Sequence, residues 1–208
     1  MKKILAIILS VVLVIAFCSC GNNSDTEQMD SDNKQDDLTN ETVPERSHVL
    51  ITMENGDEIV VELIPEYAPK TVKNFVSLVK RGFYDGLTFH RVIEGFMIQG
   101  GDPEGTGMGG SGKNIYGEFS ANGFSQNRLK HLRGVISMAR SDHPDSASSQ
   151  FFIVHQDAPH LDGQYAAFGK VISGMEVVDE IAAVETDEND KPLEDVVVES
   201  IKVIEIEE

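Results

Sequence analysis

The 208-residue sequence predicts a mainly β protein, a closed eight-stranded antiparallel β-barrel capped by two α-helices. Eight short runs of alternating or branched apolar residues are separated by turn residues, and two further segments carry apolar residues at helical spacing. Closure of the sheet is expected because it removes exposed strand edges. From His48 onward the chain has about 160 residues, enough for one domain with a sizeable core.

The chain begins with a short apolar leader. Lys2 and Lys3 precede a run from Ile4 to Phe17 that is apolar except for one serine. A basic start before about 14 such residues has the form of a signal peptide, and it is short for a bilayer span of about 20 residues. Ser19-Cys20-Gly21 then resembles a bacterial lipoprotein processing site. We expect residues 1–19 to be a lipoprotein signal peptide and Cys20 to carry the lipid. An uncleaved anchor is the alternative, and both place the domain outside the cytoplasmic membrane.

Residues 20–47 are rich in acidic, amide and hydroxyl side chains and almost free of aromatic and branched apolar ones. Such a segment cannot bury enough surface to offset its ordering entropy, so it is predicted to be an acidic disordered tether. The formal net charge of −18 argues against nucleic-acid binding, which needs a basic surface, and against adsorption to anionic lipid. With Cys20 acylated and Cys18 removed, no thiol would remain for a disulfide, a metal or a nucleophile.

The domain at 48–208 is predicted to start with a hairpin, because Asn55-Gly56 separates strand-like runs at 49–53 and 58–64. Pro69 is expected to open a helix that ends at Lys80, and a second amphipathic helix is expected at 175–184. The remaining strands are predicted at 89–93, 96–100, 135–139, 151–155, 167–172 and 196–206.

Arg91 lies within the first of these later strands, and Phe96, Met97 and Gln99 follow on the next. A guanidinium held there would be poorly solvated and would present planar donors to an entering carbonyl or amide. The residues alone leave another possibility open, an arginine paired with a carboxylate on the barrel wall.

Several other kinds of site are not expected. Seven glycines at 100–112 predict a tightly turning loop that a peptide backbone can approach closely. No lysine-serine or lysine-threonine pair opens a helix after it, which argues against a phosphate-binding loop. The six histidines lack zinc-site spacing, and no cue for a Ser-His-Asp triad is present. The sequence therefore predicts no metal and no cofactor.

Five motifs follow one another in a specific order: FHRVIEGFMIQGGD at 89–102, GKNIYGEF at 112–119, GVISMAR at 134–140, SSQFFIV at 148–154 and LDGQYAAFGKV at 161–171. They resemble the successive signatures of the cyclophilin family of peptidyl-prolyl cis-trans isomerases. The resemblance covers roughly 48–208. It implies the barrel fold and a reaction that rotates the peptide bond before proline, without a nucleophile, cofactor or metal.

The same resemblance implies the catalytic residues. Arg91 matches the family's catalytic arginine, which would donate to the prolyl nitrogen and carbonyl as the amide twists. Gln99 would orient Arg91 and the substrate.

Substrate-binding residues are implied in the same way: a proline pocket of Phe96, Met97, Phe152 and Leu161, with Gln150 and the backbone at Ala139 and Arg140 holding the chain before proline. For the apolar members the alternative is ordinary barrel core.

Three positions depart from the best-known members of the family. His160 stands in place of tryptophan, Tyr165 in place of histidine and Arg140 in place of asparagine. The first departure predicts weaker inhibition by cyclosporin, and Tyr165 keeps an aromatic wall with a hydrogen-bonding tip. Arg140 would either favour acidic residues before proline or be a solvated charge, and the sequence leaves both open.

The sequence thus predicts a monomeric, lipid-anchored peptidyl-prolyl isomerase outside the cytoplasmic membrane, acting on proline-containing peptides and unfolded exported proteins. A binding module or holdase that keeps the pocket but makes little use of catalysis is the alternative of a different class. An isomerisation assay on a soluble fragment that starts near Ser47 distinguishes the two.

Overall fold

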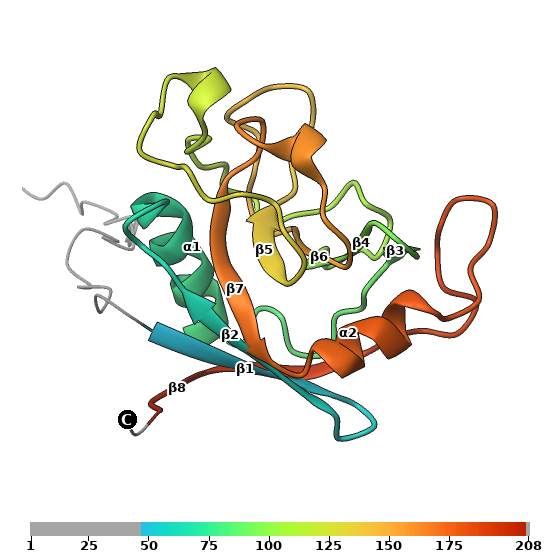
Figure 1. Ribbon diagram of the computed structural model, residues 1–208. Helices are drawn as coiled ribbons and strands as arrows, with labels where there is room; N and C mark the ends of the chain where they lie inside the picture. Colours follow the sequence, from blue (N-terminus) through green and yellow to red (C-terminus); the bar gives the residue numbers. More distant parts are fainter. Residues whose placement is uncertain (1–46, 207–208) are drawn as a thin grey trace, which may run out of the picture. The chain divides into compact units, whose positions relative to one another are not determined.

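The computed structural model describes residues 47–206 (Figure 1). The predicted signal peptide, the lipidation site at Cys20 and the tether up to Arg46 lie outside the described residues. The strands are β1 (Ser47–Met53), β2 (Glu58–Leu63), β3 (Arg91–Ile93), β4 (Met97–Gly100), β5 (Val135–Met138), β6 (Phe151–Val154), β7 (Ala167–Ser173) and β8 (Val198–Ile204). The helices are α1 (Pro69–Lys80) and α2 (Met175–Ala182), with short 3₁₀ turns at Ser120–Asn122 and Pro159–Leu161.

All eight strands belong to one antiparallel sheet in the order β3-β4-β6-β5-β7-β2-β1-β8. The prediction of eight antiparallel strands with two helices is confirmed, but the prediction of a closed barrel is wrong. The edge strands β3 and β8 do not pair with each other. The two ends of the sheet meet at the start of β8 and in the segment before β3, where Phe89 N–H donates to Val196 O at 3.0 Å and Val198 N–H donates to Leu87 O at 2.8 Å. The strand β3 begins only at Arg91, after these contacts, and forms no ladder with β8, so the curled sheet stays open.

The helix α1 has the bounds that the sequence predicts. Pro69 occupies its first turn, and Val72, Phe75, Val76 and Val79 are buried on one face. The helix α2 ends at Ala182, two residues earlier than predicted, because the Ala183 N–H turns to a bond shared between Asp179 O and Glu180 O. Packing places α1 against β7 and β8, and α2 against β2, β3 and β4. No helix within residues 47–206 is long and apolar enough to cross a membrane.

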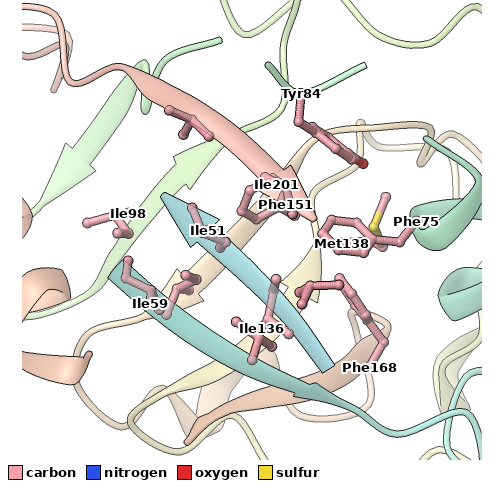
Figure 2. Close-up of a cluster of buried hydrophobic side chains, with 14 of the residues drawn as sticks. Ile51, Ile59, Phe75, Tyr84, Ile98, Ile136, Met138, Phe151, Phe168 and Ile201 are labelled. Carbon is pink, nitrogen blue, oxygen red and sulfur yellow. The ribbon is translucent and has the colours of Figure 1, made fainter. Parts of the chain in front are cut away.

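Two groups of buried side chains lie on opposite faces of the sheet around β6. The larger group fills the main core, and Figure 2 shows Phe75, Phe151 and Phe168 close together within it. Phe75 lies 5.1 Å from Phe168 and 5.5 Å from Phe151, measured between ring centroids. Since successive residues of a strand point to opposite faces, Phe152 leaves this core and joins a smaller cluster with Met97 and Leu161. The smaller cluster forms the floor of the candidate site.

Candidate active site

The register of the sheet sets three predicted site residues in one row. Arg91 on β3 pairs with Gln99 on β4, Gln99 pairs with Phe152 on β6, and Phe152 pairs with Ser137 on β5. Directly paired residues of neighbouring strands project from the same face of a sheet. The row therefore carries a cation, an amide, an aromatic ring and a hydroxyl in sequence across four strands.

A cavity of about 190 Å³ lies over this row. Its lining consists of Arg91, Phe96, Met97, Gln99, Ala139, Arg140, Phe152, Leu161 and Tyr165. The two other predicted site residues border it, since Gln150 bonds to Gln99 and the exposed His160 ring lies 5.5 Å from that of Phe96. The structure thus brings the predicted residues together in one place, while the role of each stays a prediction.

Phe152 forms the aromatic floor of the cavity and is 5% exposed. The ring stacks on His131 with centroids 6.0 Å apart and meets Tyr165 edge-on at 5.8 Å. Met97 and Leu161 are also buried in the same cluster. Lining residue and core residue are therefore not exclusive descriptions here, because these side chains are both.

His131 supports the floor from below and was not identified from the sequence. Its side chain is fully buried, with Nδ1 3.2 Å from Asp162 Oδ1 and Nε2 3.0 Å from Ser137 Oγ. Burial lowers the pKa of His131, which keeps the imidazole neutral at pH 7. Burial would raise the pKa of Asp162, but bonds from the His131 backbone and ring and from Lys130 hold it below its usual range. The only sequence cue was Asp162 within the LDG motif, which does not name its partner.

The polar rim begins at Gln99. Gln99 Nε2 donates to Gln150 Oε1 at 2.8 Å, and Gln150 Nε2 donates to Gly107 O at 3.0 Å and to Gly109 O at 2.8 Å. The glycine-rich segment is therefore tied to the site through Gln150. Gln99 makes no hydrogen bond to Arg91, which it was expected to orient.

The glycine-rich segment is organised by the buried carboxylate of Asp102. It accepts four backbone N–H bonds, from Glu104, Thr106, Gly107 and Gly109. Burial would raise the pKa of Asp102, but these N–H groups hold it below its usual range. The loop is thus a preformed wall beside the site, and within residues 47–206 no group of three or more His, Cys, Asp or Glu side chains is arranged to hold a metal ion.

Arg140 is fixed between two aromatic rings. Its guanidinium carbon lies 4.7 Å from the Tyr165 centroid and 5.0 Å from that of Phe119. Nε and Nη2 donate to Gln164 O at 3.1 and 3.0 Å, and Nη1 donates to Ser141 O at 2.8 Å. Arg140 is therefore a held part of the wall and not a freely solvated charge.

Arg91 differs from expectation in its surroundings. Its side chain is 42% exposed, so the expectation that the guanidinium is poorly solvated is wrong. Because β3 is an edge strand, Arg91 is open to solvent on one side. Nε donates to Asp190 Oδ2 at 3.3 Å, and Nη2 lies 3.2 Å from the same oxygen. The pairing with a carboxylate that the sequence left open is thus present, in a residue that also lines the cavity.

Comparison with known proteins gives one answer. The family model described as cyclophilin type peptidyl-prolyl cis-trans isomerase matches residues 48–203. Peptidyl-prolyl cis-trans isomerase B of Bacillus subtilis is 52% identical over 124 residues, which cover 60% of this chain and 82% of that protein. A longer Streptococcus pyogenes protein named as a bifunctional phosphatase/peptidyl-prolyl cis-trans isomerase is 43% identical over 196 residues; they cover 80% of this chain but 40% of that protein.

Solved structures agree with the sequence comparison. The crystal structure of a Cryptosporidium parvum cyclophilin type isomerase has a TM-score of 0.71 at 34% identity and covers 78% of this chain and 99% of its own. A second structure of that protein, in the presence of the dipeptide Ala-Pro, has a TM-score of 0.69 at 35% identity, with 76% and 99% covered. Fold, ordered motifs and relatives therefore converge, and the chain belongs to the cyclophilin-type peptidyl-prolyl cis-trans isomerases.

Proposed function

We propose that this isomerase acts on exported, incompletely folded proteins outside the cytoplasmic membrane, with Arg91 as the catalytic group and the adjoining cavity as its proline pocket. The catalytic role of Arg91 is supported by the strand register, which sets Arg91 beside a cavity with a buried apolar floor. The apolar leader before Cys20 supports the location.

The reaction needs a twisted amide to be stabilised more than a planar one. Rotation about the bond before proline has a barrier of about 18–20 kcal/mol because the bond is partly double. In the twisted state the prolyl nitrogen regains its lone pair and accepts a hydrogen bond that the planar amide does not accept. Arg91 would supply N–H donors that lie in one plane. Each 1.36 kcal/mol of preference for the twisted state gives about a tenfold faster reaction.

The pocket contributes by holding one side of the bond still. A proline ring seated among Phe96, Met97 and Phe152 is fixed by apolar contact, so rotation has to occur in the chain on the other side. Gln150 borders the cavity next to Ala139, whose N–H donates to the Gln150 carbonyl at 3.0 Å. That side of the site is where the chain before proline would lie.

The experiment that tests the catalytic role is the substitution Arg91→Lys. Lysine keeps the charge but not the planar fork, so turnover should fall by on the order of tenfold or more while the affinity for a proline peptide changes little. Arg81→Lys, at the end of α1, is the matched control and should keep the wild-type rate. Peptide exchange by NMR measures turnover and binding together. A folded Arg91→Lys protein with the wild-type rate would reject this role and favour the binding module.

The location has a separate test. Cys20→Ala should release the protein from membranes or leave an unprocessed precursor, because the lipid would have no thiol to attach to. Cys18→Ser is the control and should change neither. Membrane fractionation and the mass of the mature chain report the outcome, and normal processing and retention of Cys20→Ala would refute the lipid anchor.

A further inference from the structure

We propose that Asp190 is a positioning residue for Arg91: its carboxylate fixes the guanidinium on one edge and leaves the other edge free for the substrate. This inference rests on the proposed role of Arg91. Asp190 is 99 positions from Arg91 in the chain and belongs to the loop between α2 and β8.

The contacts identify which edge of the guanidinium is held. Asp190 Oδ2 receives the Nε–H of Arg91 at 3.3 Å and lies 3.2 Å from Nη2. In residues 47–206, no acceptor bonds to Nη1. A guanidinium has five N–H donors in one plane, so an acceptor on the Nε and Nη2 edge sets the direction in which the remaining donors point.

Asp190 is itself fixed to the strand that carries Arg91. Its carbonyl accepts the Val92 N–H at 2.8 Å, so the backbone of the loop is bonded to β3 one residue from Arg91. Its φ of 63° is the only positive one at a non-glycine residue in the described chain. Aspartate is among the few side chains that tolerate this conformation, because its short polar group can bond locally. The carboxylate is therefore presented by a set backbone and not by a flexible arm.

A second carboxylate holds the loop in shape. Asp187 Oδ1 accepts the N–H groups of Lys191 at 3.0 Å and Asn189 at 2.8 Å, and these bonds hold the pKa of Asp187 below its usual range. The Asp187 carbonyl accepts the Asp190 N–H at 3.1 Å, and Thr186 forms a bridge with Pro192. The turn is thus closed on itself before any substrate binds.

The same contact could be imagined as a latch that blocks Arg91, but the geometry points to positioning. Arg91 lines the cavity and Asp190 does not, so the carboxylate occupies no part of the proposed pocket. A latch would have to be displaced by substrate, whereas a carboxylate on the Nε edge is compatible with a substrate at Nη1.

The test uses two substitutions at Asp190 and one control. Asp190→Gly removes the carboxylate and accepts the positive φ, so the loop backbone is retained. Asp190→Asn keeps an acceptor oxygen and also tolerates this φ. Glu188→Gln removes one charge from the same loop at an exposed position, whereas the hydrogen bond and ion pair of Arg91 run to Asp190. All three are compared in the full chain with a proline-containing peptide as the probe.

A loosened guanidinium should cost turnover more than binding. Since a misplacement of about 1 Å can cost on the order of a hundredfold, we expect Asp190→Gly to lower kcat on the order of tenfold with KM changed less than about threefold. Asp190→Asn should recover most of this loss, and Glu188→Gln should keep the wild-type kcat. The NMR signal of the Arg91 Nε–H should be protected from exchange in the wild type and broadened in Asp190→Gly.

The double variant with Arg91→Lys separates this inference from the function on which it rests. If Asp190 acts through Arg91, Asp190→Gly should have no further effect in the Arg91→Lys background. An Arg91→Lys protein with the wild-type rate would refute the proposed function itself. A slow Arg91→Lys protein together with an Asp190→Gly protein of normal or raised kcat would refute the positioning role alone.

Discussion

At the scale of single residues, Phe152 is both a lining residue of the cavity and a buried core residue. The ring is 5% exposed and lies between His131 and Tyr165, while its remaining face lines the cavity. A side chain in this position contributes to the free energy of unfolding whether or not substrate is present.

Phe152→Ala should therefore weaken peptide binding and destabilise the fold together. Deleting a buried phenylalanine ring costs about 3–5 kcal/mol, and the loss of the pocket floor should raise KM on the order of tenfold. Urea unfolding and the isomerisation assay measure the two effects. Phe152→Leu is the control, because it keeps most of the apolar volume and should retain most of the stability. A folded Phe152→Ala protein with unchanged KM would show that the ring is core only.

Single residues also show how far sequence reasoning reaches. Arg91, Gln99 and Phe152 were identified from ordered motifs, and the strand register brings them into one row. Asp190 and His131 were not identified, because each contacts a partner that only the folded chain brings near. No local sequence pattern around Asp190 indicates that its carboxylate contacts Arg91 of β3.

At the scale of elements, the sequence predicted those features that depend on neighbouring residues in the chain, such as helix ends and tight turns. The bounds of α1 follow from Pro69 at its start, an apolar face and Gly82 beyond its end, all within one stretch of chain. The hairpin at Asn55-Gly56 forms for the same reason. Closure of the sheet depends on whether β3 and β8 are long enough and aligned to meet, and that is decided by tertiary packing.

Two glycines with similar backbones give an element-scale prediction. Gly56, in the first hairpin, has φ +90° and open space around it; Gly174, before α2, has φ +86°, and a Cβ there would collide with the Glu58 carbonyl of β2. Gly56→Ala should cost about 1–2 kcal/mol through the left-handed backbone alone. Gly174→Ala should cost about 1–3 kcal/mol more, because β2 and α2 must separate. Thermal and urea unfolding of both variants test this. Equal losses of stability would mean that α2 and β2 can move apart without a measurable cost.

At the scale of the whole molecule, stability should depend on pH in two windows. Burial lowers the pKa of His131, so the unfolded chain binds a proton first as the pH falls below about 6.5, and stability declines from there. The pKa of Asp179 is lowered by its bond from Arg133, so the stability that it contributes is full above about pH 4 and is lost as the pH falls through the folded pKa.

Urea unfolding between pH 8 and 4 should thus show a plateau above about pH 7 and a decline that begins near pH 6.5. His131→Gln should remove part of this decline, with His90, whose pKa burial also lowers, accounting for the rest. Turnover by the folded protein should stay nearly constant from pH 6.5 to 8, because rotation about the amide bond transfers no proton. Constant stability from pH 7 to 5 would contradict the assignment.

The row formed by Arg91, Gln99 and Phe152 should restrict insertions and deletions within its strands more than in the loops between them. These residues are aligned by β3, β4 and β6, so lengthening the loop between β4 and β5 leaves their alignment intact. Adding one residue inside the three-residue strand β3 would turn Arg91 to the opposite face, because side chains alternate along a strand. Homologues that vary freely in length elsewhere should therefore keep a constant spacing of eight positions between this arginine and its glutamine.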